Sequence, residues 1–137
     1  MSLINVFEVN QSAIRAQTTR INLIAENLAN ADVAASTPDA AYKPKYPVFR
    51  AMLDDVVDDT QSGGVTVDDI ATDNRAPRQE FNPGHALADE NGFIYLPNVD
   101  PVQEMANMMA ASQSYQTNVE LMNTAKHLLM RTLTLGQ

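Results

Sequence analysis

Residues 3–31, LINVFEVNQSAIRAQTTRINLIAENLANA, decide the fold of this chain, because apolar positions recur there in steps of three and four. Residues 105–133 show the same alternation. Such spacing keeps one apolar stripe on a single face of a long α-helix, as a coiled coil requires. The positions that we expect at helix–helix and subunit interfaces are Leu3, Phe7, Ile14, Ile21, Ile24 and Leu28, followed by Met105, Met108, Tyr115, Val119, Met122, Leu129 and Leu133.

Local signals predict where the two helices begin and end. The first is expected to run from about residues 2–5 to Ala31, with Asn30 able to take a left-handed conformation at its end. Asp100 is suited to cap the second helix, Pro101 fits its first turn, and Glu104 complements the amino-terminal dipole. We expect this helix to end at residues 132–135.

The middle of the chain differs in composition, since residues 36–98 hold six of the seven prolines and four of the five glycines. Short runs typical of β-strands occur at 46–52, 64–70 and 93–96. The sequence therefore predicts a mainly α protein with a small β-rich insertion. Its long terminal helices are expected to pair as an antiparallel coiled-coil hairpin, with the first helix in residues 1–33, the insertion in 34–98 and the second helix in 99–137.

The charge lies mostly in the insertion. Residues 32–98 hold twelve acidic and five basic side chains, so this segment carries −7 of the chain's net charge of −8. Without a basic stripe to neutralise phosphates, nucleic-acid binding is disfavoured. We find no secretory leader and no membrane-spanning run, so export is expected to use a route without a cleaved leader. The chain also lacks cysteine, which excludes disulfides and thiolate chemistry.

Catalytic and metal-binding motifs are not found. His85 and His127 have no neighbouring ligands at zinc-site spacing, and the acidic run 54–59 lacks the ligand alternation and glycine of a calcium loop. No nucleophile motif or phosphate-binding glycine loop occurs. We therefore expect a protein that is not an enzyme, with no catalytic residue, metal or cofactor.

Two segments resemble bacterial flagellar rod and hook proteins. Asn27, Leu28, Ala29 and Asn30 match the Asn-x-Ala-Asn motif near the amino terminus of that family. The tail resembles a proximal rod member at Pro97-Asn98-Val99-Asp100, at Ser114-Tyr115-Gln116 and at the closing residues 133–137. Gln113 and Thr117 depart from the family's usual Arg and Ala, which puts one inter-subunit salt bridge in doubt but leaves the fold unaffected.

The resemblance implies a structural axial subunit of the proximal rod, self-assembling through its terminal helices into a hollow, torque-transmitting shaft for motility. It implies residence in the flagellar basal body after type III export, with termini that become helical on assembly. Implied partners are further copies, other rod proteins, the rod–membrane-ring adaptor and, in transit, the export apparatus, without membrane insertion.

A coiled-coil adaptor or chaperone of a type III export system is the alternative function, and a metal-binding enzyme is a more distant one. Asn27 and Asn30 are expected to shape the helix end and to bond across to neighbouring subunits, with a solely intrachain capping role as the alternative.

Overall fold

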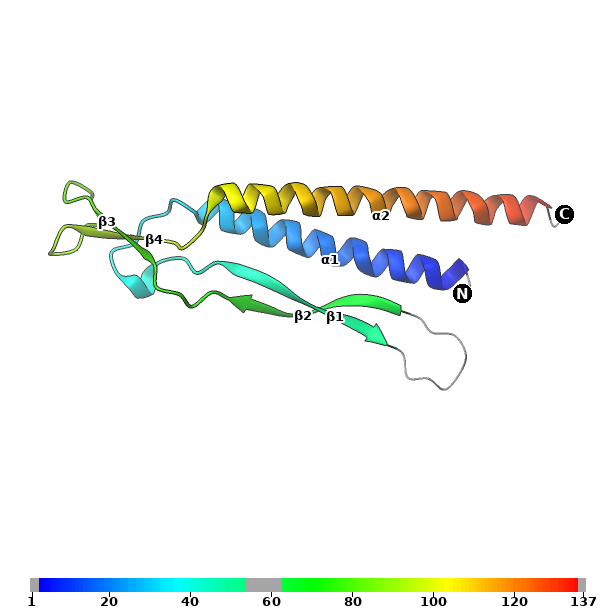
Figure 1. Ribbon diagram of the computed structural model, residues 1–137, viewed down its shortest axis with the longest axis horizontal. Helices are drawn as coiled ribbons and strands as arrows, with labels where there is room; N and C mark the ends of the chain where they lie inside the picture. The colour runs from blue at the N-terminus through cyan, green and yellow to red at the C-terminus, as the bar shows by residue number, and fades with distance from the viewer. Residues whose placement is uncertain (1–2, 54–62, 136–137) are drawn as a thin grey trace. The chain divides into compact units, whose positions relative to one another are not determined.

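The computed structural model describes residues 3–53 and 63–135 of the chain. Its two long helices and short paired strands confirm a mainly helical protein with a small β insertion (Figure 1). In chain order the elements are α1 (Leu3–Asn30), the 3₁₀ turn η1 (Pro38–Ala40), β1 (Lys45–Leu53), β2 (Gly63–Thr72), β3 (Arg78–Phe81), β4 (Phe93–Leu96) and α2 (Pro101–Leu135).

The start of α2 follows the sequence signals. The Asp100 carboxylate accepts hydrogen bonds from the backbone N–H groups of Val102 at 2.9 Å and Gln103 at 3.3 Å, which satisfies two donors of the first turn. Pro101 occupies the first helical position, where no backbone donor is needed. The cap predicted at Asp100 is therefore confirmed.

The end of α1 differs from the prediction. The left-handed conformation expected at Asn30 is wrong, because Gly92 is the only residue in the described ranges with a positive φ, 83°. The Asn30 side chain instead donates to the carbonyl oxygen of Glu26 at 2.8 Å, one turn earlier. The N–H of Ala31 then bonds to the carbonyl of Leu28, so the chain leaves the helix through a tight right-handed turn.

The strands form two separate two-stranded sheets. β1 pairs with β2, and β3 pairs with β4 in antiparallel register, with Arg78 opposite Leu96 and Phe81 opposite Phe93. On the other side of β4, Ala35 and Tyr95 exchange two backbone hydrogen bonds. The strands expected at residues 46–52, 64–70 and 93–96 are confirmed, whereas β3 was not predicted.

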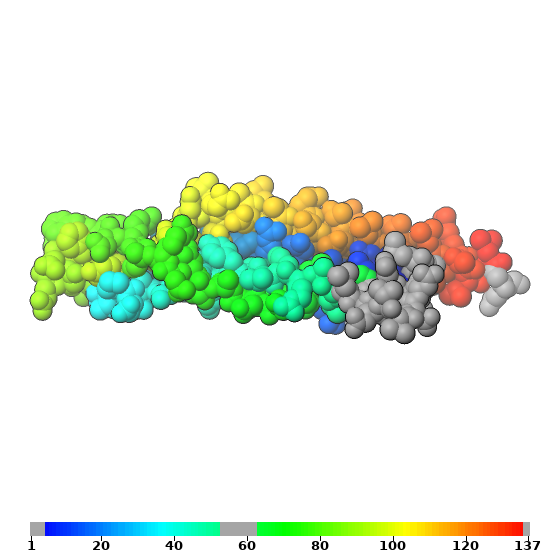
Figure 2. Space-filling model, turned by 60° about the horizontal axis from the view of Figure 1, so that its bottom comes forward, coloured from blue at the N-terminus to red at the C-terminus, as the bar shows by residue number. Residues whose placement is uncertain are grey.

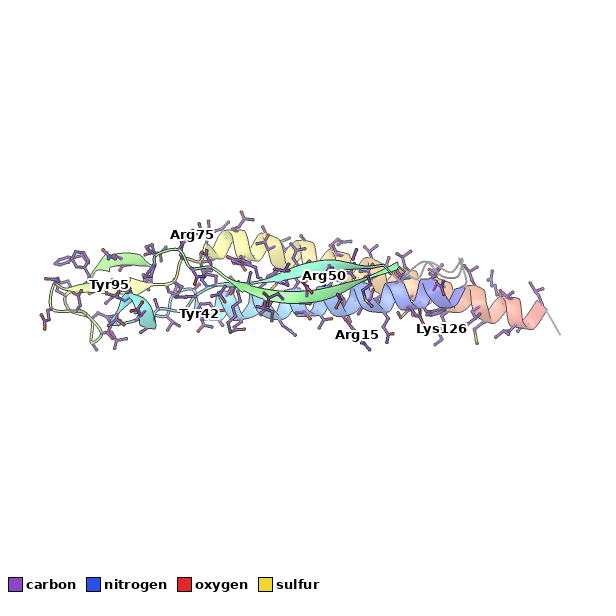
Figure 3. The ribbon with its side chains drawn as sticks, turned by 90° about the horizontal axis from the view of Figure 1, so that it is seen from below. Arg15, Tyr42, Arg50, Arg75, Tyr95 and Lys126 are labelled. Atoms are coloured by element: carbon purple, nitrogen blue, oxygen red, sulfur yellow. The ribbon has the colours of Figure 1, made fainter. Side chains whose placement is uncertain are left out.

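The chain divides into two compact units, which cut across both helices. Among the described residues, unit 1 comprises 3–21, 47–53, 63–69 and 110–135, and unit 2 comprises 22–46 and 70–109. Within unit 1 the β1–β2 ribbon runs along α1 (Figures 1 and 3), and the Val65 N–H donates to the Ser12 hydroxyl at 3.0 Å. In Figure 2 the ribbon, in cyan-green and green, faces the viewer.

Large buried apolar side chains are concentrated in unit 2. Leu23 and Ile24 from α1, Ile94 and Leu96 from β4, and Val99 are each at most 7% exposed. Three alanines of this unit are buried as well, Ala31, Ala35 and Ala41. The apolar residues that the structure shows buried in unit 1 are also alanines, namely Ala16, Ala111 and Ala125. Across the described ranges, no helix combines the length and the hydropathy that crossing a bilayer requires.

Candidate functional site

The motif residue Asn27 is fully buried within unit 2 and bonds directly to the first residue of β1. Its side-chain nitrogen donates to the Lys45 carbonyl at 3.0 Å, and its oxygen accepts from the Lys45 N–H at 3.0 Å. The amide therefore forms the same pair of hydrogen bonds with the Lys45 backbone that a residue of a neighbouring strand would form. It occupies a donor and an acceptor at the edge of β1 that would otherwise be open to another chain.

Two further partners complete the hydrogen bonding of Asn27. Its oxygen accepts from the Tyr42 hydroxyl at 2.8 Å, and its nitrogen donates to the Glu104 carboxylate at 3.2 Å. An asparagine amide has two donors and two acceptor lone pairs, and all four are used here. Asn27 thus joins three parts of unit 2: the end of α1, the segment leading into β1, and the first turn of α2. We call Asn27, Tyr42, Lys45, Glu104 and Asn107 the Asn27 junction.

Glu104 brings a carboxylate into this junction. The residue is 3% exposed, and its second oxygen accepts from the Asn107 amide at 3.3 Å. Both side-chain donors are neutral amides, and the adjacent amino terminus of α2 adds a favourable dipole. Burying a carboxylate without hydrogen-bond partners would lower the stability of the fold. The amides of Asn27 and Asn107 offset this cost by donating to the Glu104 carboxylate.

The phenol and the lysine of the junction sit nearer to solvent. Burial raises the pKa of Tyr42 to about 12, and the nearby Glu26, Tyr46 and Glu104 add to that rise. The Lys45 ammonium pairs with the Glu26 carboxylate and lies 5.9 Å from the centre of the Tyr42 ring. The hydroxyl of Tyr42 therefore remains a hydrogen-bond donor throughout the physiological pH range.

This geometry suits mechanical connection and offers no catalytic arrangement. The Asn27 amide is saturated, and the Glu104 carboxylate accepts hydrogen bonds from two amides. Among residues 3–53 and 63–135, no group of three or more His, Asp or Glu side chains is placed to hold a metal ion. The acidic run 54–59, considered as a calcium loop, lies outside the described residues.

The other motif residues occupy different environments. Leu28 is half-buried, Ala29 is exposed, and Asn30 bonds within its own helix. Among the described residues, the Asn27 side chain makes long-range hydrogen bonds, whereas the Asn30 side chain bonds to Glu26 one turn earlier.

The expected interface residues of α1 are partly covered. Ile24 is 4% exposed and packs in the core of unit 2. Phe7, Ile14 and Ile21 are half-buried in unit 1. Gln17 on the same helix is half-buried too, and its buried side-chain oxygen has no hydrogen-bond partner among the described residues. The Leu3 side chain lies outside what the structure describes.

The expected interface residues of α2 are more exposed to solvent than those of α1. Met108, Val119 and Met122 are half-buried, whereas Met105, Tyr115, Leu129 and Leu133 are exposed, Leu133 at 64%. The most buried positions of α2 are Glu104, Ala111 and Ala125, and Glu104 lies one residue before the expected interface residue Met105. Further large apolar side chains that α2 exposes are Val102, Met109, Leu121, Leu128, Met130 and Leu135.

A groove of about 460 Å³ lies in unit 1 between α1 and the β1–β2 ribbon. Arg15, Ser12 and Thr19 line it from the helix, and Met52 and Val67 line it from the ribbon. Its walls are mixed and open to solvent, without the convergent polar groups that orient a small ligand.

Sequence reasoning missed the role of Glu104 and the partners of Asn27. In the sequence, Glu104 has the position of an acidic residue that complements the helix dipole in the first turn, and the residues beside it do not indicate that it is buried. The available signal was the pairing of a motif asparagine with an acidic residue that opens the other long helix. Tyr42 and Lys45 lie in an irregular segment that has no periodic pattern.

Comparisons with known proteins bear on this arrangement. Residues 90–135 match the family described as flagellar basal body rod FlgEFG protein C-terminal. Over the full length of both chains, the sequence is 42% identical to the flagellar basal-body rod protein FlgC of Salmonella typhimurium and 44% identical to that of Yersinia enterocolitica. It is also 36% identical to the FlgC protein of Buchnera aphidicola subsp. Baizongia pistaciae, again over both full lengths.

Proposed function

Because the chain belongs to the FlgC family of flagellar basal-body rod proteins, and is a structural rod subunit rather than an enzyme, we propose how it builds the rod. As a basal-body protein it assembles with other flagellar rod components. In our proposal α1 and α2 pair as an antiparallel coiled-coil hairpin, and the remaining apolar faces pack against neighbouring subunits of a hollow, torque-transmitting proximal rod.

The observation that carries this proposal is the row of exposed apolar side chains on α2. Leu121, Leu128 and Leu135 recur at heptad spacing and are 51%, 54% and 87% exposed. Fully burying one such side chain contributes about 1.5–3 kcal/mol. A contiguous apolar stripe on a soluble chain marks a contact surface. Repeated over many copies, this burial stabilises a shaft without covalent links.

Two features support pairing of the helices. The hydrogen bond from Asn27 to Glu104 joins the end of α1 to the start of α2. The buried positions Ala16, Ala111 and Ala125 are small enough to let helices approach closely. The hairpin would join residues 1–33 and 99–137 into one coiled-coil domain, with residues 34–98 as the acidic insertion.

Counting outward along antiparallel helices from Asn27 and Glu104 brings Leu3 level with about residue 128 of α2. The last seven or so residues of α2 would then project roughly 10 Å beyond α1 at 1.5 Å per residue. Leu129, Met130, Leu133 and Leu135 lie on that projection, and all are exposed. A neighbouring subunit is the natural cover for them.

We propose that the partners are further copies of the chain, other rod proteins and the adaptor between rod and membrane ring. The chain would reach the basal body through the flagellar type III export apparatus without a cleaved leader. A coiled-coil adaptor or chaperone of that export system is less well supported, because the full-length relatives are rod proteins. Asn27 and Asn30 would shape the junction inside each subunit, with Leu28 and Ala29 beside it.

The experiment that tests this proposal replaces Leu129, which is 36% exposed, by Asp. We expect Leu129→Asp to be made and exported but to abolish rod assembly and motility, because a charge cannot be buried in the apolar contact. Gln116→Asp changes an exposed polar position of the same helix and serves as the control. Normal motility of the Leu129→Asp strain would refute the interface.

A further inference from the structure

The chain contains a single Asn-Gly pair, Asn91-Gly92. An asparagine loses its amide spontaneously when the backbone nitrogen of the following residue attacks the side-chain Cγ. Glycine permits this attack best, because it has no side chain to obstruct it and the backbone around it is the most flexible. Asn91 is exposed and lies in the turn that joins β3 to β4 within unit 2 (Figure 1). From the sequence alone, Asn91 is therefore the asparagine most prone to deamidation.

The fold opposes this reaction by engaging the Gly92 nitrogen. The Gly92 N–H donates to the carbonyl oxygen of Asp89 at 2.9 Å, and the Asp89 N–H donates to the Phe93 carbonyl at 2.9 Å. An amide whose proton is held in a hydrogen bond is harder to deprotonate, and deprotonation is what makes the nitrogen nucleophilic. Gly92 is also buried, which restricts access of the water or hydroxide that would remove the proton.

The conformation of the turn opposes ring closure as well. The hydrogen bond between Asp89 and Gly92 spans four residues, and neither Glu90 nor Asn91 has a positive φ. These features indicate a type I turn, in which ψ of the third residue, Asn91, is about 0°. At that ψ the Gly92 nitrogen eclipses the Asn91 nitrogen, whereas a five-membered ring requires it alongside the Asn91 Cβ. The ring can therefore close only after the turn opens.

The Asp89 carboxylate holds the turn closed. One of its oxygens accepts from the N–H groups of Asn91 and Phe93, each at 2.9 Å, and the other accepts from the Tyr95 hydroxyl at 3.1 Å. These bonds, led by the one from Phe93, hold the pKa of Asp89 below its ordinary value, so the side chain is ionised at neutral pH. Hydrogen bonds to an ionised acceptor are stronger than those between neutral groups. Asp89 thus fixes the backbone on both sides of the bond between Asn91 and Gly92.

We propose that Asn91 is a latent deamidation site, which the Asp89 carboxylate keeps unreactive in the folded chain. When the turn opens, the Gly92 nitrogen bonds to Cγ of Asn91 and the bond from Cγ to the side-chain nitrogen breaks. The backbone amide proton leaves with that nitrogen as ammonia. Water then opens the resulting succinimide at either of its carbonyl groups, which gives aspartate or isoaspartate at position 91.

Deamidation would prevent the turn from closing as before. Isoaspartate routes the backbone through the side-chain methylene and so adds one atom to the turn, and both products add a negative charge beside Asp89 and Glu90. The strand that follows the turn, β4, buries Ile94 and Leu96, so a defective turn would loosen the core of unit 2. The site therefore bears on how long a subunit remains intact, which lies beyond the proposed function of packing into the rod.

Incubation of the full-length free chain at neutral pH, in buffer and in concentrated guanidinium chloride, tests the proposal. Peptide mass spectrometry, with chromatographic separation of the aspartate and isoaspartate forms, follows the loss of each asparagine amide. In denaturant we expect Asn91 to react faster than every other asparagine. In buffer we expect Asn91 to react at least about tenfold more slowly than in denaturant, because reaction then requires local opening. Equal rates at Asn91 in the two solvents would overturn the proposal, as would faster loss at another asparagine in denaturant.

Asp89→Ala is the matching variant, and Asp32→Ala, at an exposed position of the same unit, is its control. Asp89→Ala removes three hydrogen bonds and should raise the rate at Asn91 in buffer by about fivefold or more, whereas Asp32→Ala should leave the rate within about twofold. Far-UV circular dichroism establishes that the variant remains folded. If Asp89→Ala unfolds, Asp89→Asn, which keeps a neutral acceptor oxygen, takes its place with a smaller expected rise. An unchanged rate at Asn91 in the folded variant would show that Asp89 does not protect it.

Discussion

Asn27 pairs with the backbone of Lys45 through both ends of its side-chain amide, at 3.0 Å in each direction. A helix side chain thereby takes the place of a neighbouring strand at the first residue of β1. Ordinary core side chains could fill the same volume, but none could satisfy the Lys45 backbone, the Tyr42 hydroxyl and the Glu104 carboxylate together. The family's motif asparagine therefore has an intrachain structural role in this protein.

Asn27→Asp is expected to destabilise the chain strongly. The change keeps the size of the side chain but replaces its donor with an anionic oxygen, which would face the Glu104 carboxylate and the Lys45 carbonyl. We predict a loss of about 3–5 kcal/mol in the free energy of unfolding, measured by urea titration of the free chain. Asn30→Asp, at a half-buried position with one local bond, should cost about 1 kcal/mol or less.

A second substitution, at Glu104, tests whether charge repulsion causes the loss of stability in Asn27→Asp. Glu104→Gln removes the negative charge that would repel Asp at position 27 and supplies an amide donor to it. The Asn27→Asp/Glu104→Gln double variant should therefore be more stable than Asn27→Asp alone, giving a coupling energy of about 1–3 kcal/mol in a double-mutant cycle. Additive effects of the two substitutions would contradict direct contact between the two side chains.

Stability at alkaline pH should depend on Tyr42. The ordinary phenol pKa is 10.0, and the folded chain raises the pKa of Tyr42 to about 12. The folded state then binds more protons than the unfolded state between these values, so the contribution of Tyr42 is complete below pH 10 and is lost as pH rises towards 12. Tyr42→Phe should therefore show a shallower fall in unfolding free energy than the original chain from about pH 9 to about pH 11.5.

The Tyr42→Phe variant must be compared with the original chain, because burial also raises the pKa of Tyr46 and a hydrogen bond to Asp89 raises the pKa of Tyr95. Those two phenols titrate in both proteins, so only the difference in slope reports Tyr42. Identical slopes would mean that the Tyr42 hydroxyl is not held in the junction.

Gly92→Ala should damage the turn between β3 and β4. Gly92 has a φ of 83°, and a Cβ there would lie 2.9 Å from Cε2 of Phe81 and 3.1 Å from Cβ of Pro83. We predict a loss of about 1–3 kcal/mol by urea unfolding, since left-handed backbone and steric contact both oppose the side chain. A Cβ at Gly84 would meet only Asn82 at 3.9 Å. A Gly84→Ala variant as unstable as Gly92→Ala would show that the positive φ is not the cause.

Ala111→Leu tests which face of α2 is covered. Ala111 is 0% exposed, whereas its neighbour Ala110 is exposed. Enlarging a fully covered position forces packed elements apart, typically at about 1–3 kcal/mol. We expect Ala111→Leu to reduce incorporation into isolated basal bodies, with Ala110→Leu incorporated more normally. The reverse order would show that Ala110, and not Ala111, lies on the covered face of α2.

Much of the fold could be predicted because its signals are local. The Asp100–Pro101 start of α2 and the strand-forming run at residues 93–96 depend on neighbouring residues, and both are confirmed. β3 carries no such signal, since its four residues are all exposed and follow directly after Pro77. The partners of Asn27 were not predicted, because Glu104 lies 77 residues away and an acidic residue is normally solvated.

The positions of α2 that are buried in the single chain differ from the stripe of its large apolar residues. The buried positions Ala111 and Ala125 are small, and Glu104 is charged, so all three contribute little to a pattern of large apolar residues. Met105 and Leu133 dominate that pattern but remain exposed in the single chain. Large exposed side chains and small buried ones are what a helix needs if its closest contact is intramolecular and its apolar remainder awaits a neighbour.

The accessibility of position 128 in free and assembled chains tests the central claim most directly. The chain contains no cysteine, so Leu128→Cys introduces a single thiol at a site 54% exposed. Glu90→Cys, in an exposed turn of the insertion, reports whether reagent reaches the rod. We predict that a maleimide labels Leu128→Cys rapidly in the free chain and at least about tenfold more slowly in purified basal bodies, as expected for a thiol buried at a subunit contact. Equal labelling of Leu128→Cys in the free chain and in the rod would contradict assembly through this face of α2.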